Sequence, residues 1–213
     1  MPRTQAAQSA SEKKSIHASE RDSQRVQALR AEYLEQISAC EVSQLKFVDE
    51  AGATIAMTRL YGRAAPGHRV VDAVPQNYGA SQSLLGVLSL DGIGAPWVVE
   101  GAVDGEVFRV WVRELLCPTL EVGDIVVMDK LRAHKVSGIE EAIRGRGASL
   151  IYLSPYSPDF NPIEQCWSKI KTYLRQAKAR SIEALIEAIK QALETISASD
   201  ARAWFAHCGY AVH

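Results

Sequence analysis

The stretch Asp124-Ile-Val-Val-Met-Asp129 decides the fold class of this chain. Its four central residues are all apolar, without the alternation of apolar and polar side chains shown by a strand with one face in solvent. Such a strand belongs inside a sheet that is covered on both faces. It ends in an acid, Asp129, and this predicts a carboxylate at the edge of that sheet.

Two more acids lie next to predicted strands. The segment Leu45 to Asp49 predicts a short buried strand that ends in an acid, with a loop over Glu50 to Gly52. A third strand over Ser149 to Leu153 precedes a turn-rich segment and a helix that begins at Asn161-Pro162. Glu164 falls in the first turn of this helix. One compact domain can therefore gather three carboxylates.

The remaining segments predict an alternation of strands and helices. The first half of the chain predicts a helix from Ser23 with apolar positions up to Ile37, then a loop over 62–80 with a short strand around Arg69 to Val74, and then a hairpin of Ser83–Leu90 and Ala95–Val99 around Asp91–Gly94. The second half predicts three helices besides the one that carries Glu164. They run from an Asp104 N-cap to before Pro118, from a capping box at Ser137–Glu140 to Gly145–Gly147, and from Ser181 to Ile196. This order fits an α/β, ribonuclease H-like fold, which has a mixed central sheet with helices on both faces.

Composition and length indicate one ordinary domain with its own core, because 213 residues are 47% hydrophobic. We expect a flexible tail over residues 1–22, a lead-in linker helix over 23–40 and a catalytic domain over 41–213. No apolar run is long enough for a membrane span, and no signal peptide is evident, so we expect a cytoplasmic protein that does not associate with membranes. The four cysteines contain no CxxC pair and are expected to be buried thiols.

Basic residues are concentrated in one part of a chain whose net charge is −1. From Lys130 to Arg180 there are ten Lys and Arg and four Asp and Glu, a local charge of +6. Such a surface suits contact with phosphate, although a solvated helix surface accounts for it equally well.

The three acids Asp49, Asp129 and Glu164 are the candidates for chemistry. Carboxylates held close together repel one another and are stabilised by cations, and Mg²⁺ prefers oxygen ligands. Two such ions can activate a water or a 3′-hydroxyl on one side of a phosphate and stabilise the leaving oxygen on the other. The pattern therefore predicts metal-dependent phosphodiester chemistry.

Each of these positions also has a simpler interpretation. Glu164 can complete a capping box with Asn161, and Asp129 can cap the turn after it. Asp49 competes with its neighbour Glu50, because adjacent strand residues point to opposite faces and only one can join the site. His134 is a candidate accessory or metal-binding residue, or an ordinary hydrogen-bonded histidine.

Three blocks of the sequence resemble the DDE transposases of the mariner superfamily, in their bacterial insertion-sequence branch. The blocks are Phe47-Val-Asp-Glu50, Ile125-Val-Val-Met-Asp129 followed by Ala133-His-Lys135, and Leu153-Ser-Pro-Tyr-Ser-Pro-Asp-Phe-Asn-Pro-Ile-Glu164 with Gln165 to Lys169. The 34 residues between Asp129 and Glu164 also match the spacing of that branch.

The resemblance implies that Asp49, Asp129 and Glu164 are the catalytic, metal-binding triad of a transposase. It implies two Mg²⁺ ions, with Mn²⁺ as a substitute, and metal-dependent cleavage at element ends followed by strand transfer into target DNA. The DNA partners are terminal repeats and target DNA, bound by a homodimer near the bacterial nucleoid. We expect DNA contacts from basic residues after the second acid: Lys135, Lys169, Lys171, Arg175 and Lys178.

The chain departs from the family pattern at two positions. Lys130 stands where the family usually has Asn, which puts a positive charge beside a cation site, and Ser154 replaces a usual Pro. The helix-turn-helix region that reads terminal repeats is also not seen, so we expect it from a separately encoded subunit, or lost in a relic. Two alternatives stay open: a catalytically impaired DNA-binding remnant, and a ribonuclease H-like nuclease acting on RNA hybrids.

Overall fold

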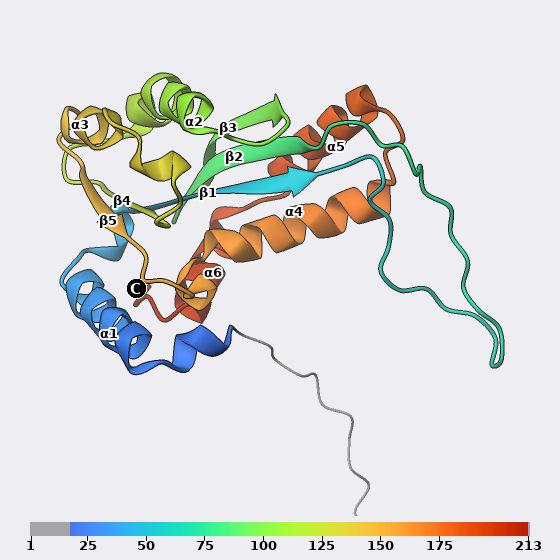
Figure 1. The fold of residues 1–213 in the computed structure, drawn as a ribbon, viewed down its shortest axis with the longest axis horizontal. Helices are drawn as coiled ribbons and strands as arrows, with labels where there is room; N and C mark the ends of the chain where they lie inside the picture. The colour runs from blue at the N-terminus through green and yellow to red at the C-terminus, as the bar shows by residue number, and fades with distance from the viewer. Residues whose placement is uncertain (1–17, 213) are drawn as a thin grey trace, which may run out of the picture.

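The computed structural model describes residues 18–212, which fold around a mixed five-stranded sheet in the order β3-β2-β1-β4-β5 (Figure 1). The strands are β1 (Leu45–Ala53), β2 (Gln82–Ser89), β3 (Gly92–Glu100), β4 (Ile125–Met128) and β5 (Ser149–Tyr152). Strand β4 lies between β1 and β5, parallel to both, and all four of its residues are buried. The prediction of an interior strand after Asp124 is confirmed.

Side chains of alternating strand positions divide the core into two layers. Phe47 and Val127 belong to a cluster on one face of the sheet, and Val48 and Val126 to a cluster on the other. The first face is covered by α1 (Gln24–Ser38), α4 (Ile163–Ala177), α5 (Ile182–Glu194) and α6 (Ala198–His207), the second by α2 (Gly105–Trp111) and α3 (Ile139–Arg144). Helices on both faces confirm the predicted α/β architecture.

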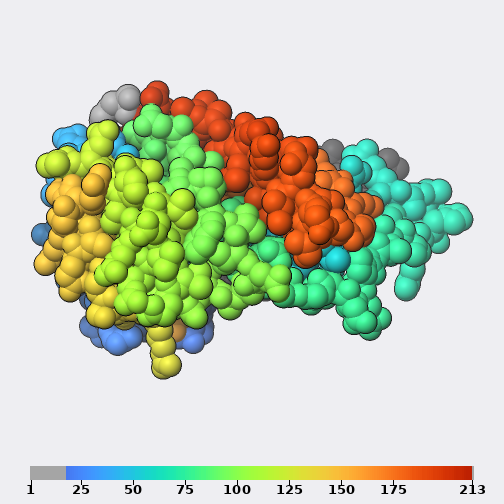
Figure 2. Space-filling view, turned by 90° about the horizontal axis from the view of Figure 1, so that it is seen from above, coloured from blue at the N-terminus to red at the C-terminus, as the bar shows by residue number. Residues whose placement is uncertain are grey.

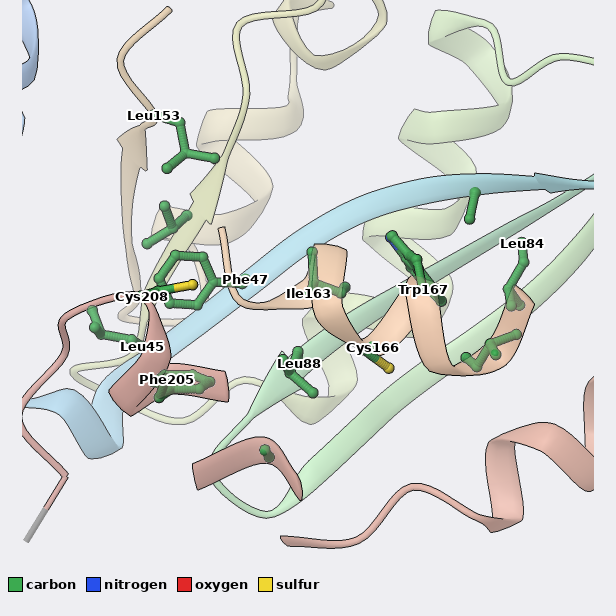
Figure 3. Packing of buried hydrophobic residues seen from close by; sticks show 14 of the residues in the cluster. Leu45, Phe47, Leu84, Leu88, Leu153, Ile163, Cys166, Trp167, Phe205 and Cys208 are labelled. Carbon is green, nitrogen blue, oxygen red and sulfur yellow. The ribbon is translucent and has the colours of Figure 1, made fainter. Parts of the chain in front are cut away.

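Helix α4 lies close to the sheet because one strand position has no side chain. Ile163 and Trp167 of α4 are buried in the cluster that contains Phe47 and Leu88, as Figure 3 shows. A Cβ atom on Gly86 would lie 3.1 Å from Cη2 of the Trp167 ring. The glycine therefore lets the indole pack directly on β2, and this fixes the helix that carries Glu164.

The predicted lead-in helix is present as α1, whose N-cap Ser23 accepts a hydrogen bond from the Val26 backbone N–H. Arg30 is buried; it donates to Ser157 Oγ at 2.6 Å and forms an ion pair with Asp159 at 2.7 Å. These contacts attach α1 to the loop before α4. Most of the expected tail, residues 1–22, lies outside the described residues, and Ser19–Asp22 form a 3-10 turn.

Replacing Arg30 by Met is expected to lower the free energy of unfolding by about 2 kcal/mol, because Asp159 keeps its charge and loses its closest cation. The effect is smaller than for a fully buried pair, since the Asp159 side chain is 37% exposed. Urea denaturation measures it. The matched control is Arg25→Met at an exposed position of the same helix, with an expected change below about 0.5 kcal/mol. Equal effects of the two substitutions would contradict the role of the ion pair.

The structure contains a helix that the sequence analysis missed. Helix α6 begins with a capping box in which Ser197 and Asp200 exchange hydrogen bonds, and it buries Ala201 and Phe205. Ser197 and Asp200 have the spacing of a capping box, and this spacing could have predicted the start of the helix. Before α3, by contrast, the sequence predicted a capping box that the structure does not contain. The box is absent because Gly138 at φ 89° is the N-cap and offers no side chain.

Two predictions around the antiparallel strands are wrong. The hairpin loop is shorter than Asp91–Gly94, because Gly92 and Gly94 already pair with Ser89 and Val87. The short strand expected around Arg69 to Val74 does not form, and Val71 there is 89% exposed. Without a neighbouring strand or a buried face, β-branched residues do not stabilise a strand.

Residues 54–81 instead form a long arm between β1 and β2, which extends beyond the body of the molecule at one end (Figure 2). Its base is held to the end of α4, where Lys178 pairs with Asp72 at 2.6 Å and Arg180 donates to the Ile55 carbonyl at 2.8 Å. Within residues 18–212, no helix combines the length and the hydrophobicity that a membrane-crossing segment requires.

Candidate active site

A cavity of about 260 Å³ lies where β1, the end of β4 and the start of α4 meet. All three predicted carboxylates, Asp49, Asp129 and Glu164, line it. The loop after β5 forms much of the remaining wall, with Ser154 and Asn161 among its residues. The structure therefore brings together the acids that sequence reasoning selected.

The parallel pairing of β1 and β4 explains why the two aspartates are neighbours. Phe47 pairs with Val127, and two residues further along each chain stand Asp49 and Asp129. Asp129 follows the end of β4, as predicted, but Asp49 does not end its strand. Strand β1 continues to Ala53 by pairing with β2, where Asp49 is opposite Gly86.

Glu164 reaches the cavity from the first turn of α4, and the interpretation of this residue as part of a capping box is wrong. Pro162 is the N-cap and makes no side-chain hydrogen bond to the helix. Asn161 is buried, and among the described residues its Oδ1 has no hydrogen-bond partner. Glu164 itself is exposed, so its carboxylate is available to the cavity.

Loss of solvation and repulsion between carboxylates both act on the acids of the cavity. Burial, and then the neighbouring Glu164 carboxylate, raise the pKa of Asp49 from its ordinary value of 3.8 to about 7. The Glu164 side chain is exposed, but the surrounding protein partly excludes water from its carboxyl group and raises its pKa, against the opposing charge of Lys171; Asp129 raises it further. Such a site is stabilised by protons or by cations.

Glu50 and His134 form a second polar group directly behind the cavity. His134 is completely buried, with Nε2 3.1 Å from Glu50 Oε2 and Nδ1 2.7 Å from Asp129 Oδ1. Burial alone would lower the pKa of His134, but the hydrogen bonds to Asp129 and Glu50 outweigh it and raise the pKa to about 9. Asp49, not Glu50, lines the cavity, yet Glu50 joins the site through His134. Sequence reasoning missed this role.

Lys130 lies at the same cavity. It is exposed, and its Nζ atom is 6.0 Å from the centroid of the Tyr152 ring. The side chain of Lys130 therefore contributes to the cavity wall, and its ammonium group lies near the Tyr152 ring.

The basic residues expected to contact DNA fall into two groups. Lys171 and Arg175 lie seven and eleven residues after Glu164 on α4, a spacing that places all three on one helix face. Lys135 is exposed after β4. Two others already have protein partners. Lys169 pairs with Asp200 at 2.8 Å, and Lys178 pairs with Asp72.

The donor set of the cavity fits a hard divalent cation, since three carboxylates supply only oxygen ligands. In the part of the chain that the structure describes, no three His, Cys, Asp or Glu side chains are gathered tightly enough to hold a metal ion as they stand. The fit therefore concerns the chemistry of the donors and their shared cavity.

The five-stranded mixed sheet, with helices on both faces, is a ribonuclease H-like fold. The chain belongs to the DDE superfamily endonucleases, whose family pattern matches residues 44–186. Asp49, Asp129 and Glu164 all lie inside the matched segment. A search among curated proteins found no match.

Solved structures with this fold include several of the Mos1 transposase. The paired-end complex with the left transposon end has a TM-score of 0.70 at 14% identity, over 96% of this chain and 63% of that chain. The mariner Mos1 paired-end complex with Mg has a TM-score of 0.74 at 10% identity, over 95% of this chain and 65% of that chain. The Mos1 catalytic domain alone has a TM-score of 0.59 at 11% identity, over 91% of this chain and 89% of that chain. The similarity extends to the fold, and this chain spans less than two thirds of the first complex.

Substituting Asn for Asp49 is expected to stabilise the metal-free protein at pH 8 by about 1–2 kcal/mol and to have little effect near pH 4. The raised pKa of Asp49 means that the folded protein holds a proton more tightly than the unfolded chain. Wild-type stability is therefore lost as the pH rises from about 4 through about 7, and the amide removes this loss.

Urea unfolding of both proteins across this pH range measures the difference. The raised pKa of His134 lowers stability further as the pH rises from 6.5 through about 9, but it does so in both proteins and cancels. Added Mg²⁺ should stabilise the wild type at pH 8 and stabilise the variant less. A variant less stable than the wild type at pH 8 would contradict the proposed repulsion.

Proposed function

We propose that this chain is the catalytic domain of a DNA transposase, which cuts DNA at element ends and joins the freed ends to target DNA. The observation that carries the proposal is the single cavity lined by Asp49, Asp129 and Glu164, in a chain of the DDE superfamily endonucleases. Structures with the same fold include a Mos1 strand transfer complex and a pre-cleavage Mos1 transpososome.

Two Mg²⁺ ions, which Mn²⁺ can replace, are the cofactors that we infer. Asp49, Asp129 and Glu164 would hold them through carboxylate oxygens, and rotation of the Asp49 and Glu164 side chains toward Asp129 would complete the ligand set. Mos1 paired-end complexes have been solved with Mg and with Mn. When bound, the ions activate the attacking oxygen and stabilise the leaving oxygen of the phosphodiester.

The protein side chains contribute charge and orientation to this reaction. The cavity walls hold the scissile phosphate next to the carboxylates, with water as the nucleophile in cleavage and the freed 3′-hydroxyl in strand transfer. Lys171 lies on the same helix face as Glu164, and its charge already acts on that carboxylate. We infer that it also attracts a phosphate of the bound strand.

The DNA surface proposed here runs along α4 away from the cavity. Lys171 and Arg175 continue the face of Glu164, and Lys135 adds positive charge on the side of β4. Lys169 and Lys178 would have to leave Asp200 and Asp72 to bind phosphate, so we expect smaller losses of affinity from their replacement. We further propose that the chain acts as a homodimer on terminal-repeat DNA and target DNA, together with a separately encoded helix-turn-helix subunit. We also propose that it comes from a bacterial insertion sequence.

A nicking assay tests the function. Terminal-repeat duplex is incubated with Mg²⁺ or Mn²⁺, using the wild type, Asp129→Asn and the exposed hairpin acid variant Asp91→Asn, each with the proposed helix-turn-helix subunit. We expect metal-dependent nicks from the wild type and Asp91→Asn and none from Asp129→Asn. Nicking that survives Asp129→Asn would refute the proposed site. Preferential cutting of an RNA–DNA hybrid would favour a ribonuclease H-like nuclease.

A catalytically impaired remnant is the second candidate, and Lys130 is the observation that favours it. Its side chain lines the cavity together with three carboxylates, and we infer that its positive charge opposes the binding of cations there. If the copy is impaired, Lys130→Asn should raise the rate of Mn²⁺-dependent nicking by about tenfold, since one charge interaction of about 1.4 kcal/mol has that effect. The exposed Lys190→Asn is the control. An unchanged rate in Lys130→Asn would show that Lys130 does not limit this copy.

A further inference from the structure

His134 is held in place from several sides, although it lies in a short 3-10 turn, Ala133–Lys135. Its ring packs on Phe108 of α2 with 4.2 Å between the ring centroids. The turn is also closely packed against the start of α2, where a Cβ atom on Gly105 would come within 2.2 Å of Val136 Cγ2. The imidazole therefore has little freedom to rotate.

Both nitrogens of the ring face carboxylate oxygens. Nδ1 is 2.7 Å from Asp129 Oδ1, and Nε2 is 3.1 Å from Glu50 Oε2. The two acids come from different strands, since Glu50 belongs to β1 and Asp129 follows β4. The imidazole thus connects the two strands that carry the aspartates of the cavity.

The same contacts decide which oxygen of Asp129 is available. Oδ1 accepts from the backbone N–H of Leu131 at 3.1 Å in addition to its contact with His134. The Leu131 N–H and the nearby imidazole thus hold Oδ1, and Nδ1 also lies 3.3 Å from the backbone carbonyl oxygen of Asp129. Oδ2, which has no protein donor among the described residues, is left for the cavity. An aspartate held in this way does not need to be oriented again when a cation binds.

We propose that Glu50 and His134 are positioning residues for the metal-binding carboxylates. His134 orients Asp129, and Glu50 orients His134. The proposal rests on the proposed function, because it assumes a divalent cation at Asp49, Asp129 and Glu164. Neither residue touches the reacting atoms. Their effect passes through Asp129, so it should appear in cation affinity as well as in cleavage.

The test measures Mn²⁺ affinity by electron paramagnetic resonance, which follows the signal of the free ion. Glu50→Ala is expected to weaken Mn²⁺ binding by about tenfold or more, whereas Glu50→Gln, which still offers an oxygen to His134, should stay within about threefold of the wild type. The Glu50 side chain is 24% exposed, so both variants are expected to fold. Glu106→Ala, at an acid that is 68% exposed on α2, is the matched control.

A pair of substitutions at His134 separates orientation from packing. The amide nitrogen in His134→Asn stands close to the position of Nδ1 and can still donate to Asp129, whereas that in His134→Gln stands close to Nε2. We expect His134→Asn to keep more Mn²⁺ affinity than His134→Gln. A role in packing alone favours no such order, so equal losses in the two variants would overturn the proposal.

The outcomes also distinguish this inference from the proposed function. If the wild type binds no Mn²⁺ at this site, or if Asp129→Asn binds it as well as the wild type, the metal site itself is refuted. If Asp129→Asn loses binding while Glu50→Ala keeps wild-type affinity, the metal site stands and the positioning role is overturned.

Discussion

Replacing Glu164 by Gln is expected to lower metal-dependent DNA cleavage by about 10³-fold or more, with little loss of stability. The amide keeps the size of the side chain but removes one of the three carboxylates that line the cavity. Losing a metal-held charge in the transition state costs several kcal/mol, and about 4 kcal/mol corresponds to 10³ in rate. Single-turnover nicking with saturating Mn²⁺ measures the effect.

Glu183→Gln is the matched control, because Glu183 is also an acid in the first turn of a helix, α5. If Glu164 served only the start of its helix, the two substitutions would have similar small effects on stability and none on cleavage. Cleavage that falls less than tenfold in Glu164→Gln would contradict its assignment to the site.

Trp167→Ala is expected to have the largest effect on stability, a loss of about 3–5 kcal/mol in the free energy of unfolding. The indole is 2% exposed and fills the space over Gly86, so its removal leaves a cavity between α4 and β2. Among the described residues, Nε1 has no hydrogen-bond partner, so the loss is one of packing. Since whole domains are stable by about 5–15 kcal/mol, the variant should be close to unfolding.

Chemical denaturation measures this loss, with Trp167→Phe as a partial replacement that should cost less than half as much. Tyr61→Ala, at an aromatic residue that is 89% exposed on the arm, serves as the control and should change stability by less than about 0.5 kcal/mol. A cost below about 1.5 kcal/mol for Trp167→Ala would show that α4 can relax into the space.

Local patterns in the sequence predicted most of the fold. Uninterrupted apolar residues before Asp129 marked an interior strand, and helical spacing from Ile163 to Leu174 marked the helix that carries Glu164. Both signals come from residues that are near one another in the chain. Helix α6 had a local signal as well, in Ser197 and Asp200, but it was not used.

The features that could not be predicted depend on contacts between distant residues. Asp49 lies inside β1 because the second half of that strand pairs with β2, and no residue near Asp49 specifies this pairing. The contact of Glu50 with His134 spans 84 residues and needs both strand orientation and register. The sequence could select the acids of the cavity, but it could not show how the cavity is supported.

The attachment of α1 has a consequence for the protein as it leaves the ribosome. Arg30 and Tyr33 meet Asp159 and Tyr210, which lie 129 and 177 residues later in the chain. At about 5–20 residues per second, Tyr210 is made roughly 9–35 s after Tyr33. A helix of 15 residues is only marginally stable alone, so α1 waits for these partners during synthesis. Helix α1 is thus made before its partners and is among the last of the described helices to reach its final place.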